Sequence, residues 1–424
     1  MPEGKVVHDA VHGSIRFEGC LLRLLDSPEV QRLNGIKQLG FAYLVFPGAN
    51  HTRLEHSIGV SYMAGVMGER LGFSNDEIEF LRVAGLLHDI AHTPFSHALE
   101  FLLHNKIGKD HMQVGRDIIT GKMDILAETP FEDSERVYEI LKDCGHDPDR
   151  VARAILGAGT EGTLFARPDR ESALFSVIHG SLDADQLDYL VRDAHYTGVA
   201  HGVIDLPRIL NTVVLHENKI VWERGGVPAL EGLFVARALM YNSVYFHKTS
   251  RIAELMITRA LEEVEVDDWM RIFSMNDADL MALLREAGGF AREVYHRIKH
   301  RQLYKIAFSI TPDKVTGELR ERIQELGKIE KRRQMEESIA FKAGIEPEHV
   351  LIDVPYVVLR ISEPRFWKMN VMILENGRMR NLLQVSPLAK ALREKSVVQV
   401  ALMVTTLPQF REKVGKIAER TFSS

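Results

Sequence analysis

The chain has 424 residues, of which 45% are hydrophobic and 26% charged, so it has enough apolar material for two or three domains. Its net charge of −6 gives no broad basic surface, which argues against nucleic acid as a partner. Two cysteines, Cys20 and Cys144, exclude a disulfide framework and fit a reducing cytoplasm. We expect neither a signal peptide nor a membrane span, because the chain lacks an apolar run of about 18 residues.

Most of the first 310 residues have the apolar spacing of helices. Residues 76–92 are predicted to form a helix, and residues 182–198 another that stops near Gly198. Residues 211–225 differ, because two β-rich runs flank a turn-forming HENK, which predicts a hairpin inserted among helices. Residues 230–264 are long and apolar on one face.

The sequence changes character after about residue 310. Residues 313–344 form a charged helical region, and four short runs after it favour strands: HVLIDVP, YVVLRIS, NVMILENG and VVQVALMV. We therefore predict a mainly α domain over residues 1–314 and a small α+β domain over residues 315–424.

Nine of the 18 histidines lie before residue 112, and three of them fall within LLHDIAHTPFSH (86–97). His88 and Asp89 are adjacent at the end of a predicted helix, and imidazole and carboxylate are both ligands for divalent metals. His92 follows on the same predicted helical face, and Pro94 can turn His97 back toward the same cavity. An isolated His-Asp pair usually has no function. Whether His88 and Asp89 bind a metal therefore depends on which other residues the fold brings near them.

Two other segments supply candidates for these residues. HTRLEHS (51–57) offers two histidines and an arginine, and LDADQLDYLVRD (182–193) offers four aspartates. The aspartates could form a solvated face. However, Asp185, Tyr189 and Asp193 are spaced by four residues, which places them on one stripe and predicts a pocket wall.

These segments, together with KVVHDAVHGSI, QRLNGIKQLGFAYLVFPGANHTRLEHSIGV and YFHKTSRIAELMI, resemble the HD-domain metal-dependent phosphohydrolase superfamily over roughly residues 4–310. More narrowly, they resemble its deoxynucleoside triphosphate triphosphohydrolase branch. The resemblance implies a helical HD core over about residues 50–200. It also implies hydrolysis of a dNTP to the deoxynucleoside and inorganic triphosphate.

The resemblance implies one divalent cation, which could be Mn, Fe, Ni, Co, Zn or Mg, with additional Mg²⁺ accompanying the nucleotide as an option. The implied metal ligands are His56, His88, Asp89 and Asp185. The implied phosphate-binding and proton-transfer residues are His92, His97 and His111. His97 or His92 is the predicted acid, and Glu100 is expected to orient His97. Met112 stands where relatives often carry Glu, which removes the expected orienter of His111.

Arginines at positions 53 and 237 match phosphate contacts of the family, and planar guanidinium groups suit phosphate. The implied deoxyribose contacts are Gln38, Leu39 and Tyr189, with Asp193 joining Gln38 at the 3′-hydroxyl. Tyr241 stands on the base side, where some relatives have His. Gln186 replaces a Lys that relatives often carry after the last metal Asp. The alternative reading of IKQLGFAYLVF is a packed helix followed by core residues.

Relatives bind activating nucleotides between subunits of a tetramer, which implies a homo-oligomer here, a tetramer or a dimer. The residues matching those nucleotide sites are Lys5, Val6, Asp26, Gln31, Val45, Phe46, His247 and Lys248, with departures at Asn34 and Ser243. Two alternatives stay open. One is another phosphohydrolase, a nucleotidase or phosphodiesterase, which Gln186 favours. The other is a nucleotide-sensing regulatory protein, against which the complete metal-ligand set argues.

Overall fold

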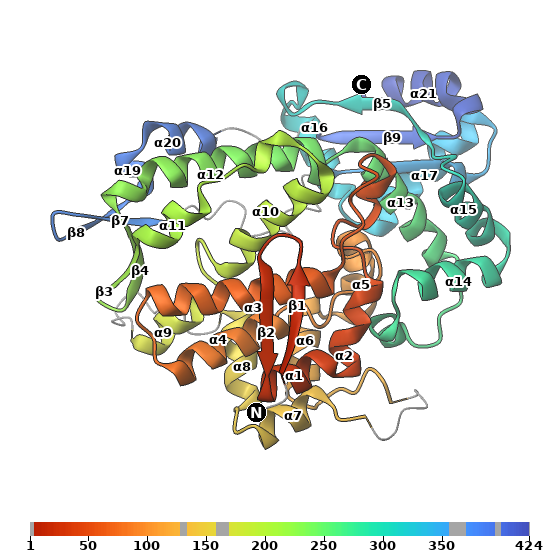
Figure 1. Cartoon of the computed structure of the whole chain (residues 1–424). Coiled ribbons are helices and arrows are strands. Elements are labelled where there is room, and N and C mark those ends of the chain that lie inside the picture. The colour runs from red at the N-terminus through yellow and green to blue at the C-terminus, as the bar shows by residue number, and fades with distance from the viewer. Residues whose placement is uncertain (1–3, 128–133, 158–168, 356–369, 395–399, 424) are drawn as a thin grey trace.

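The computed structural model describes residues 4–127, 134–157, 169–355, 370–394 and 400–423, and helices predominate in it (Figure 1). The α-helices are α1 Gly19–Asp26, α2 Pro28–Gln31, α3 Arg53–Arg70, α4 Asn75–Leu87, α5 Glu100–Ile107, α6 His111–Ile119, α7 Val137–Asp143, α8 Pro148–Leu156, α9 Arg170–Phe175, α10 Ala184–Thr197, α11 Leu206–Thr212, α12 Val227–Met240, α13 Lys248–Glu262, α14 Asp277–Ala287, α15 Gly289–Lys299, α16 Gly317–Glu325, α17 Ile329–Ala343, α19 Leu382–Val385, α20 Pro387–Glu394 and α21 Arg411–Ser423. The strands are β1 Gly4–Asp9, β2 Gly13–Glu18, β3 Val213–His216, β4 Lys219–Glu223, β5 Lys305–Ile310, β6 Val350–Asp353, β7 Met372–Glu375, β8 Arg378–Asn381 and β9 Leu402–Thr406. The mainly α prediction is confirmed, and no helix in the described part of the chain is long and apolar enough to cross a bilayer.

Helices α3 and α4 pack against each other in the main hydrophobic core and carry two of the candidate metal ligands at their ends. Each helix begins at a capping box. The Thr52 hydroxyl accepts the Glu55 N–H while the Glu55 carboxylate accepts the Thr52 N–H, and Ser74 and Glu77 repeat the arrangement on α4. Because these caps fix where the helices start, they also fix where His56 and His88 lie.

Helix α10 lies against α3 at a point where α3 has a glycine. A methyl group on Gly59 would overlap the carboxylate of Asp188 and the guanidinium of Arg192, both on α10. The helix begins and ends close to the prediction, since Asp183 caps its N-terminus and Gly198 closes it with φ +72°.

The predicted helix over residues 76–92 ends earlier, at Leu87. Arg32 explains the difference, because its buried guanidinium donates to the carbonyls of Ile90 and His92, both at 2.8 Å. Those carbonyls therefore find partners outside a helix, and the chain turns at His88. His92 consequently does not share a helical face with His88.

Strands β1 and β2 form an N-terminal hairpin that was not predicted. Its turn is shaped by Asp9, whose Oδ1 accepts the N–H groups of Val11 and His12, and by Gly13 at φ +78°. Sequence periodicity missed it because β1 lacks the apolar-polar alternation of a half-buried strand: Val6 is 49% exposed, and Val7 beside it is partly buried.

The hairpin predicted over residues 211–225 is confirmed as β3 and β4, joined by Glu217 and Asn218 at positive φ. It does not stand alone, because β4 pairs in parallel with β7, and β8 completes a four-stranded sheet in the order β3-β4-β7-β8. The sheet thus joins chain segments about 150 residues apart.

The remaining C-terminal strands form a separate antiparallel sheet, β5-β9-β6, whose own apolar cluster includes residues of α16, α17 and α21. The predicted strands HVLIDVP and NVMILENG correspond to β6 and β7, and the end of VVQVALMV corresponds to the start of β9. YVVLRIS and residues 397–399 lie outside the described residues. Strands β5 and β8 were not predicted. The domain boundary at residue 314 stays a prediction, and strand pairing crosses it in both sheets.

Replacing Gly59 with Ala is expected to destabilise the protein by about 1–3 kcal/mol, because the added methyl overlaps a buried ion pair. Gly232→Ala is the matched control, since an added methyl there meets open space in the middle of α12. That change should stabilise by about 0.5–1 kcal/mol through helix propensity. Urea denaturation measures both changes. Equal midpoints for the two variants would contradict the packing argument.

The Arg170 guanidinium lowers the pKa of the Glu77 carboxyl in the α4 cap to about 2. A lowered carboxyl pKa stabilises the fold above the unfolded value near 4.3, and this stabilisation is lost as the pH falls toward 2. Because Arg170 is half exposed, we expect Glu77→Gln to cost about 1 kcal/mol at pH 7 and almost nothing near pH 2. Denaturant titrations across this range test it. A cost that does not change with pH would show that the ion pair is not responsible.

Candidate metal centre and active site

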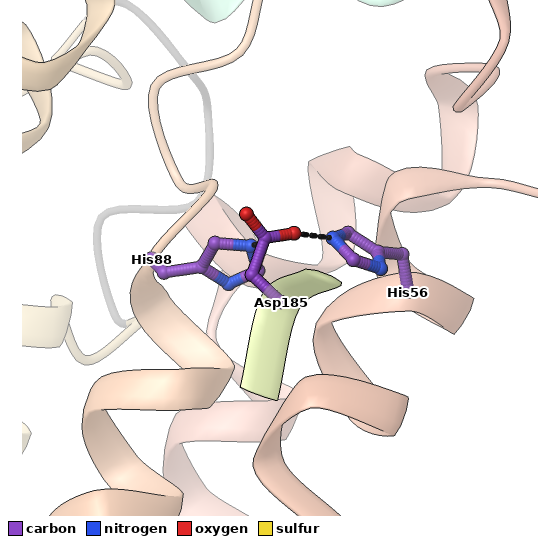
Figure 2. A group of neighbouring side chains, drawn as sticks. All are labelled: His56, His88 and Asp185. Carbon is purple, nitrogen blue, oxygen red and sulfur yellow. Dashed lines mark hydrogen bonds and ion pairs between the residues drawn. The ribbon is translucent and has the colours of Figure 1, made fainter. Parts of the chain in front are cut away.

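Three helix ends bring two imidazoles and a carboxylate together. His56 lies in the first turn of α3, His88 directly follows α4, and Asp185 lies in the first turn of α10. Asp185 stands between the two rings in Figure 2, with its Oδ1 3.1 Å from His56 Nε2 and 3.9 Å from His88 Nε2. One ligand atom from each residue lies within 4.8 Å of the other two, so the group could hold a metal ion.

Asp89, the fourth predicted ligand, lies beside this group. Its Oδ1 is 3.2 Å from His88 Nε2, and its Oδ2 is 3.7 Å from His56 Nε2. Asp89 is only 7% exposed, and its Oδ2 also accepts a 2.6 Å bond from Arg53. Arg53 therefore places a buried guanidinium directly beside the candidate centre.

Both imidazoles are oriented for metal ligation. His56 Nδ1 donates to Asp188 Oδ2 at 2.8 Å, and His88 Nδ1 donates to the Gly85 carbonyl at 2.8 Å. These bonds direct each Nε2 toward the centre, as outer-shell partners of metal-binding histidines do. His88 Nε2 is buried without a hydrogen-bond partner among the described residues, which fits an atom meant for a cation.

The charges of the site agree with this arrangement. Burial works against protonation of His56, but Asp185 and Asp188 outweigh it and raise the pKa of the imidazole to about 10. The same negative field that attracts a proton to His56 Nε2 attracts a divalent cation. A mixed set of imidazole and carboxylate ligands suits several first-row metals.

The predicted catalytic histidines form a second cluster around one acid. His97 Nδ1 and His111 Nδ1 lie 3.1 and 2.7 Å from Glu100 Oε1, and the His92 ring stacks on that of His111. Glu100 therefore contacts His111 as well as His97, so the loss of an acid at position 112 does not leave His111 without a carboxylate. Burial would raise the pKa of Glu100, but the two histidines hold it well below its usual range.

His92 differs from its neighbours because it is fully enclosed. Its Nε2 lies 3.2 Å from Asp89 Oδ1, which places it against the candidate metal ligands. Burial and the charge of Arg53 hold the pKa of His92 well below its ordinary value, so the ring is neutral. His97 is 44% exposed at its side chain and lies 3.2 Å from Arg53 through Nε2.

The predicted sugar-binding residues surround a buried hydrogen-bond network. Asp193 accepts bonds from His51 at 2.8 Å and from the Tyr245 hydroxyl at 2.7 Å. The Tyr189 ring stands edge-on to that of Tyr245, and Gln38 is tied to His51 through a backbone bond of 3.0 Å. Leu39 follows Gln38 and packs on the main core. Of the stripe predicted on α10, Tyr189 and Asp193 thus both contact Tyr245, whereas Asp185 contacts His56.

Arg237 and Tyr241 come from α12 and the π-helical turn Tyr241–Tyr245 that follows it. Arg237 donates to Gln186 Oε1 at 3.0 Å, and its guanidinium lies over the Tyr241 ring at 5.9 Å. Gln186 thus gives Arg237 a neutral acceptor, at the position where the family resemblance predicts a lysine. The wider π turn brings the rings of Tyr241 and Tyr245 to 4.8 Å.

Residues predicted for nucleotide activation fall into two places. Lys5 and Asp26 pair at 2.6 Å on the surface beside Val6 on the N-terminal hairpin, and Gln31 bonds the Leu25 carbonyl at 2.7 Å. Phe46, which follows Val45, stands edge-on to the His247 ring. His247 and Lys248 line a cavity of about 430 Å³ that also contains Arg301, Lys305 and Arg411.

Sequence reasoning missed the residues that hold the ligands in place. Asp188 was noted only as one of four acids, although it lies one turn after Asp185 and orients His56. Arg32, His12 and Arg192 lie within the quoted segments but were given no role there. A buried charge on an otherwise apolar face was the available signal, because such a residue needs a partner.

Comparison with known proteins agrees with the mainly α fold. The family profile for the HD domain matches residues 53–157, and the profile for the HD associated region matches residues 204–423. The crystal structure of a hypothetical protein from Aquifex aeolicus superposes with a TM-score of 0.72 at 30% identity, covering 98% of this chain and 100% of that one.

Relatives with known and unknown functions are both similar to the chain. An uncharacterized protein of Methanocaldococcus jannaschii is 33% identical over 98% of this chain and 81% of its own length. Human deoxynucleoside triphosphate triphosphohydrolase SAMHD1 is 28% identical over 82% of this chain and 60% of its own length. The matched profiles, the extent of these relatives and the His-Asp centre together show that the chain belongs to the HD-domain family of metal-binding phosphohydrolases.

Proposed function

We propose that this HD-domain hydrolase cleaves deoxynucleoside triphosphates to the deoxynucleoside and inorganic triphosphate. The observation that carries the proposal is the convergence of His56, His88, Asp89 and Asp185 next to the cluster of His92, His97, His111 and Glu100. Similarity to SAMHD1, whose name states this activity, supports the substrate class.

One divalent cation held by the first group would supply a Lewis acid for a phosphoryl oxygen and for water. The four ligands leave coordination positions for both, because only two imidazoles and two carboxylates are present. Arg53 stands against Asp89 at 2.6 Å, so its guanidinium can bind a phosphate oxygen next to the centre. Arg237 offers a second planar cation for the polyphosphate.

The 5′-oxygen of the departing deoxynucleoside needs a proton. We assign this role to His97 because its side chain is 44% exposed and the Glu100 carboxylate, 3.1 Å from its Nδ1, can orient the ring. His92 is neutral and enclosed, which suits it to hold a phosphate oxygen through an N–H. Tyr189, with its ring edge-on to Tyr245, would pack against a sugar that lacks a 2′-hydroxyl.

Product analysis by anion-exchange chromatography tests the proposal. Each dNTP is incubated with the protein and Mn²⁺ or Mg²⁺, with and without GTP. We expect deoxynucleoside and intact triphosphate, and no turnover or retained metal in His88→Ala/Asp89→Ala. His104→Ala is the control, since it removes an exposed imidazole on α5. Stepwise release of phosphate, or no product under any condition, would refute the assignment.

A nucleotidase or phosphodiesterase is the second candidate, and Gln186 is the observation that favours it. Its side chain is 5% exposed and binds Arg237 as a neutral acceptor, so the site has one cation fewer than relatives with Lys. A triphosphate carries roughly four negative charges and depends on such cations more than a monoester does. The same product analysis with dGMP and a cyclic nucleotide separates the two candidates.

Charge at position 186 should therefore control the affinity for triphosphates. We expect Gln186→Lys to lower the KM for a dNTP several-fold, and the near-isosteric Gln186→Glu to raise it by a similar factor, because the added charge lies beside the phosphates. Gln186→Glu is the matched comparison, since its carboxylate still accepts from Arg237. Initial rates at constant Mn²⁺ give both values. A KM that is the same in both variants would place the phosphates elsewhere.

We extend the proposal to nucleotide activation in a homo-oligomer, a tetramer or a dimer. Lys248, Arg301, Lys305 and Arg411 give the 430 Å³ cavity a charge that suits a polyphosphate, and His247 supplies an aromatic wall. The GTP arm of the product analysis tests activation, and light scattering on the same samples gives the mass. A monomer that GTP neither activates nor assembles would refute this extension.

A further inference from the structure

One buried carboxylate connects the candidate metal ligand His56 with the N-terminal hairpin. Asp188 is fully buried, and its Oδ2 accepts from His56 Nδ1 at 2.8 Å. Its Oδ1 accepts from His12 Nε2 at 2.6 Å. Arg192, one turn later on α10, donates to both oxygens at 2.8 and 3.0 Å. Asp188 is thus held by three different side chains, and only one of them belongs to the metal centre.

The hairpin turn closes this network into a ring. Arg192 Nη1 donates to Asp9 Oδ2 at 2.8 Å, while Asp9 Oδ1 accepts the backbone N–H groups of Val11 and His12. The carboxylate of Asp9 therefore shapes the turn that carries His12. His12 in turn reaches Asp188, so each contact fixes the geometry of the next.

His12 is built into the protein, although it lies on a surface turn. Its side chain is only 5% exposed, and its ring packs against Tyr62 of α3 at 5.1 Å. His8, four residues earlier on the same hairpin, is different. Its ring is exposed and bonds the hydroxyl of Ser14 on the neighbouring strand. The two histidines of KVVHDAVHG therefore have different roles, and only His12 reaches the network.

We propose that the hairpin turn supports the metal centre, with His12 and Asp9 acting through Asp188 as positioning residues for His56. This inference rests on the proposed function, because it requires a cation at His56. The ring of His56 is kept in one tautomer and one orientation by Asp188, and the orientation of Asp188 is set by donors from the hairpin. Strand β1, which also carries Lys5 and Val6, is thereby joined to a metal ligand by side-chain bonds alone.

The physical consequence concerns metal affinity. Without His12, Oδ1 of Asp188 keeps only Arg192, and the carboxylate is free to turn toward it and away from His56. The basicity and direction of His56 Nε2 then change. Removal of an outer-shell partner of a metal ligand typically weakens metal binding by about 10–100-fold. Because His12 acts one contact farther out than Asp188, we expect the lower end of this range.

The test measures Mn²⁺ binding by full-length, chelator-treated protein, with free Mn²⁺ determined by electron paramagnetic resonance. The variants are His12→Ala, His12→Gln, Asp9→Asn and the control His8→Ala, and thermal melting of each metal-free protein reports the fold. We expect the dissociation constant for Mn²⁺ to be about 10-fold higher in His12→Ala than in the wild type, and unchanged in His8→Ala. Gln can donate from nearly the same position, so His12→Gln should restore most of the affinity. Asp9→Asn keeps an acceptor for the turn but loses the charge facing Arg192, so it should weaken binding as well.

Each outcome decides the inference. Equal dissociation constants for wild type, His12→Ala and Asp9→Asn would overturn it while leaving the proposed metal centre intact. If His12→Ala does not melt cooperatively, it does not fold normally and its affinity is set aside. The test then uses Asp9→Asn and His12→Gln, since each retains a hydrogen-bonding side chain at its position. Affinity in His12→Gln as weak as in Asp9→Asn would then overturn the role of His12 as a donor. Absence of Mn²⁺ binding in the wild type would overturn the metal centre itself, which distinguishes failure of the proposed function from failure of this inference.

Discussion

The arrangement of the site depends on a single buried carboxylate, that of Asp188. Burial alone would raise its pKa, but Arg192, His12 and His56 hold it well below its usual range, so the group is ionised inside the core. Removal of one partner from such a buried pair typically costs about 3–5 kcal/mol, because the remaining charge stays desolvated. Helices α3 and α10 and the N-terminal hairpin are therefore held together by charge at the point where the candidate metal centre begins.

This dependence explains why Gly59 lies where the two helices cross. The carboxylate and guanidinium of α10 occupy the space that a side chain on α3 would fill. The close approach lets His56, one turn earlier on α3, reach both Asp188 and Asp185. Asp185 also lies in the first turn of α10, where unpaired N–H groups of the helix favour a carboxylate or a phosphate. Packing and electrostatics thus favour the same location for the site.

Local sequence signals predicted the parts of this site that depend on spacing. Asp185, Tyr189 and Asp193 do lie along one side of α10, and Gly198 does end that helix, because helical periodicity and capping are local properties. The end of α4 was not predictable in this way. It depends on Arg32, which lies 56 residues before His88 in the sequence. The Arg32 guanidinium donates to the carbonyls of Ile90 and His92, which therefore do not continue the helix. Two partners of Asp188, His56 and His12, are likewise distant in sequence, so no local pattern indicates them. Arg192 differs, because it lies one turn later on the same helix, at the spacing of a helical ion pair.

The C-terminal residues were predicted as strands and helices, but their placement was not. Strand β7 pairs with β4 and places α19 and α20 beside α12 (Figure 1), the helix that carries Arg237. Arg251 on α13 binds the buried Asp353 of β6 at 2.8 Å, which joins the second sheet to the helix after the π turn. Parallel pairing and buried ion pairs between distant segments leave no periodic trace in the sequence.

The two regions matched by family profiles share one site. The HD match, residues 53–157, contains three of the proposed metal ligands and the proposed catalytic histidines: His56, His88, Asp89, His92, His97 and His111. The HD associated region, residues 204–423, contains Arg237, Tyr241 and Tyr245. Asp185, Asp188 and Asp193 all lie on α10, between the two matches. Asp185 and Asp188 contact His56 on α3, and Asp193 accepts from Tyr245 of the π turn. Helix α10 is therefore the element that converts two sequence regions into one site. A shift of α10 would move Asp185, the proposed metal ligand, Asp188, which orients His56, and Asp193, the proposed sugar contact, together, because all three lie on the same rigid helix.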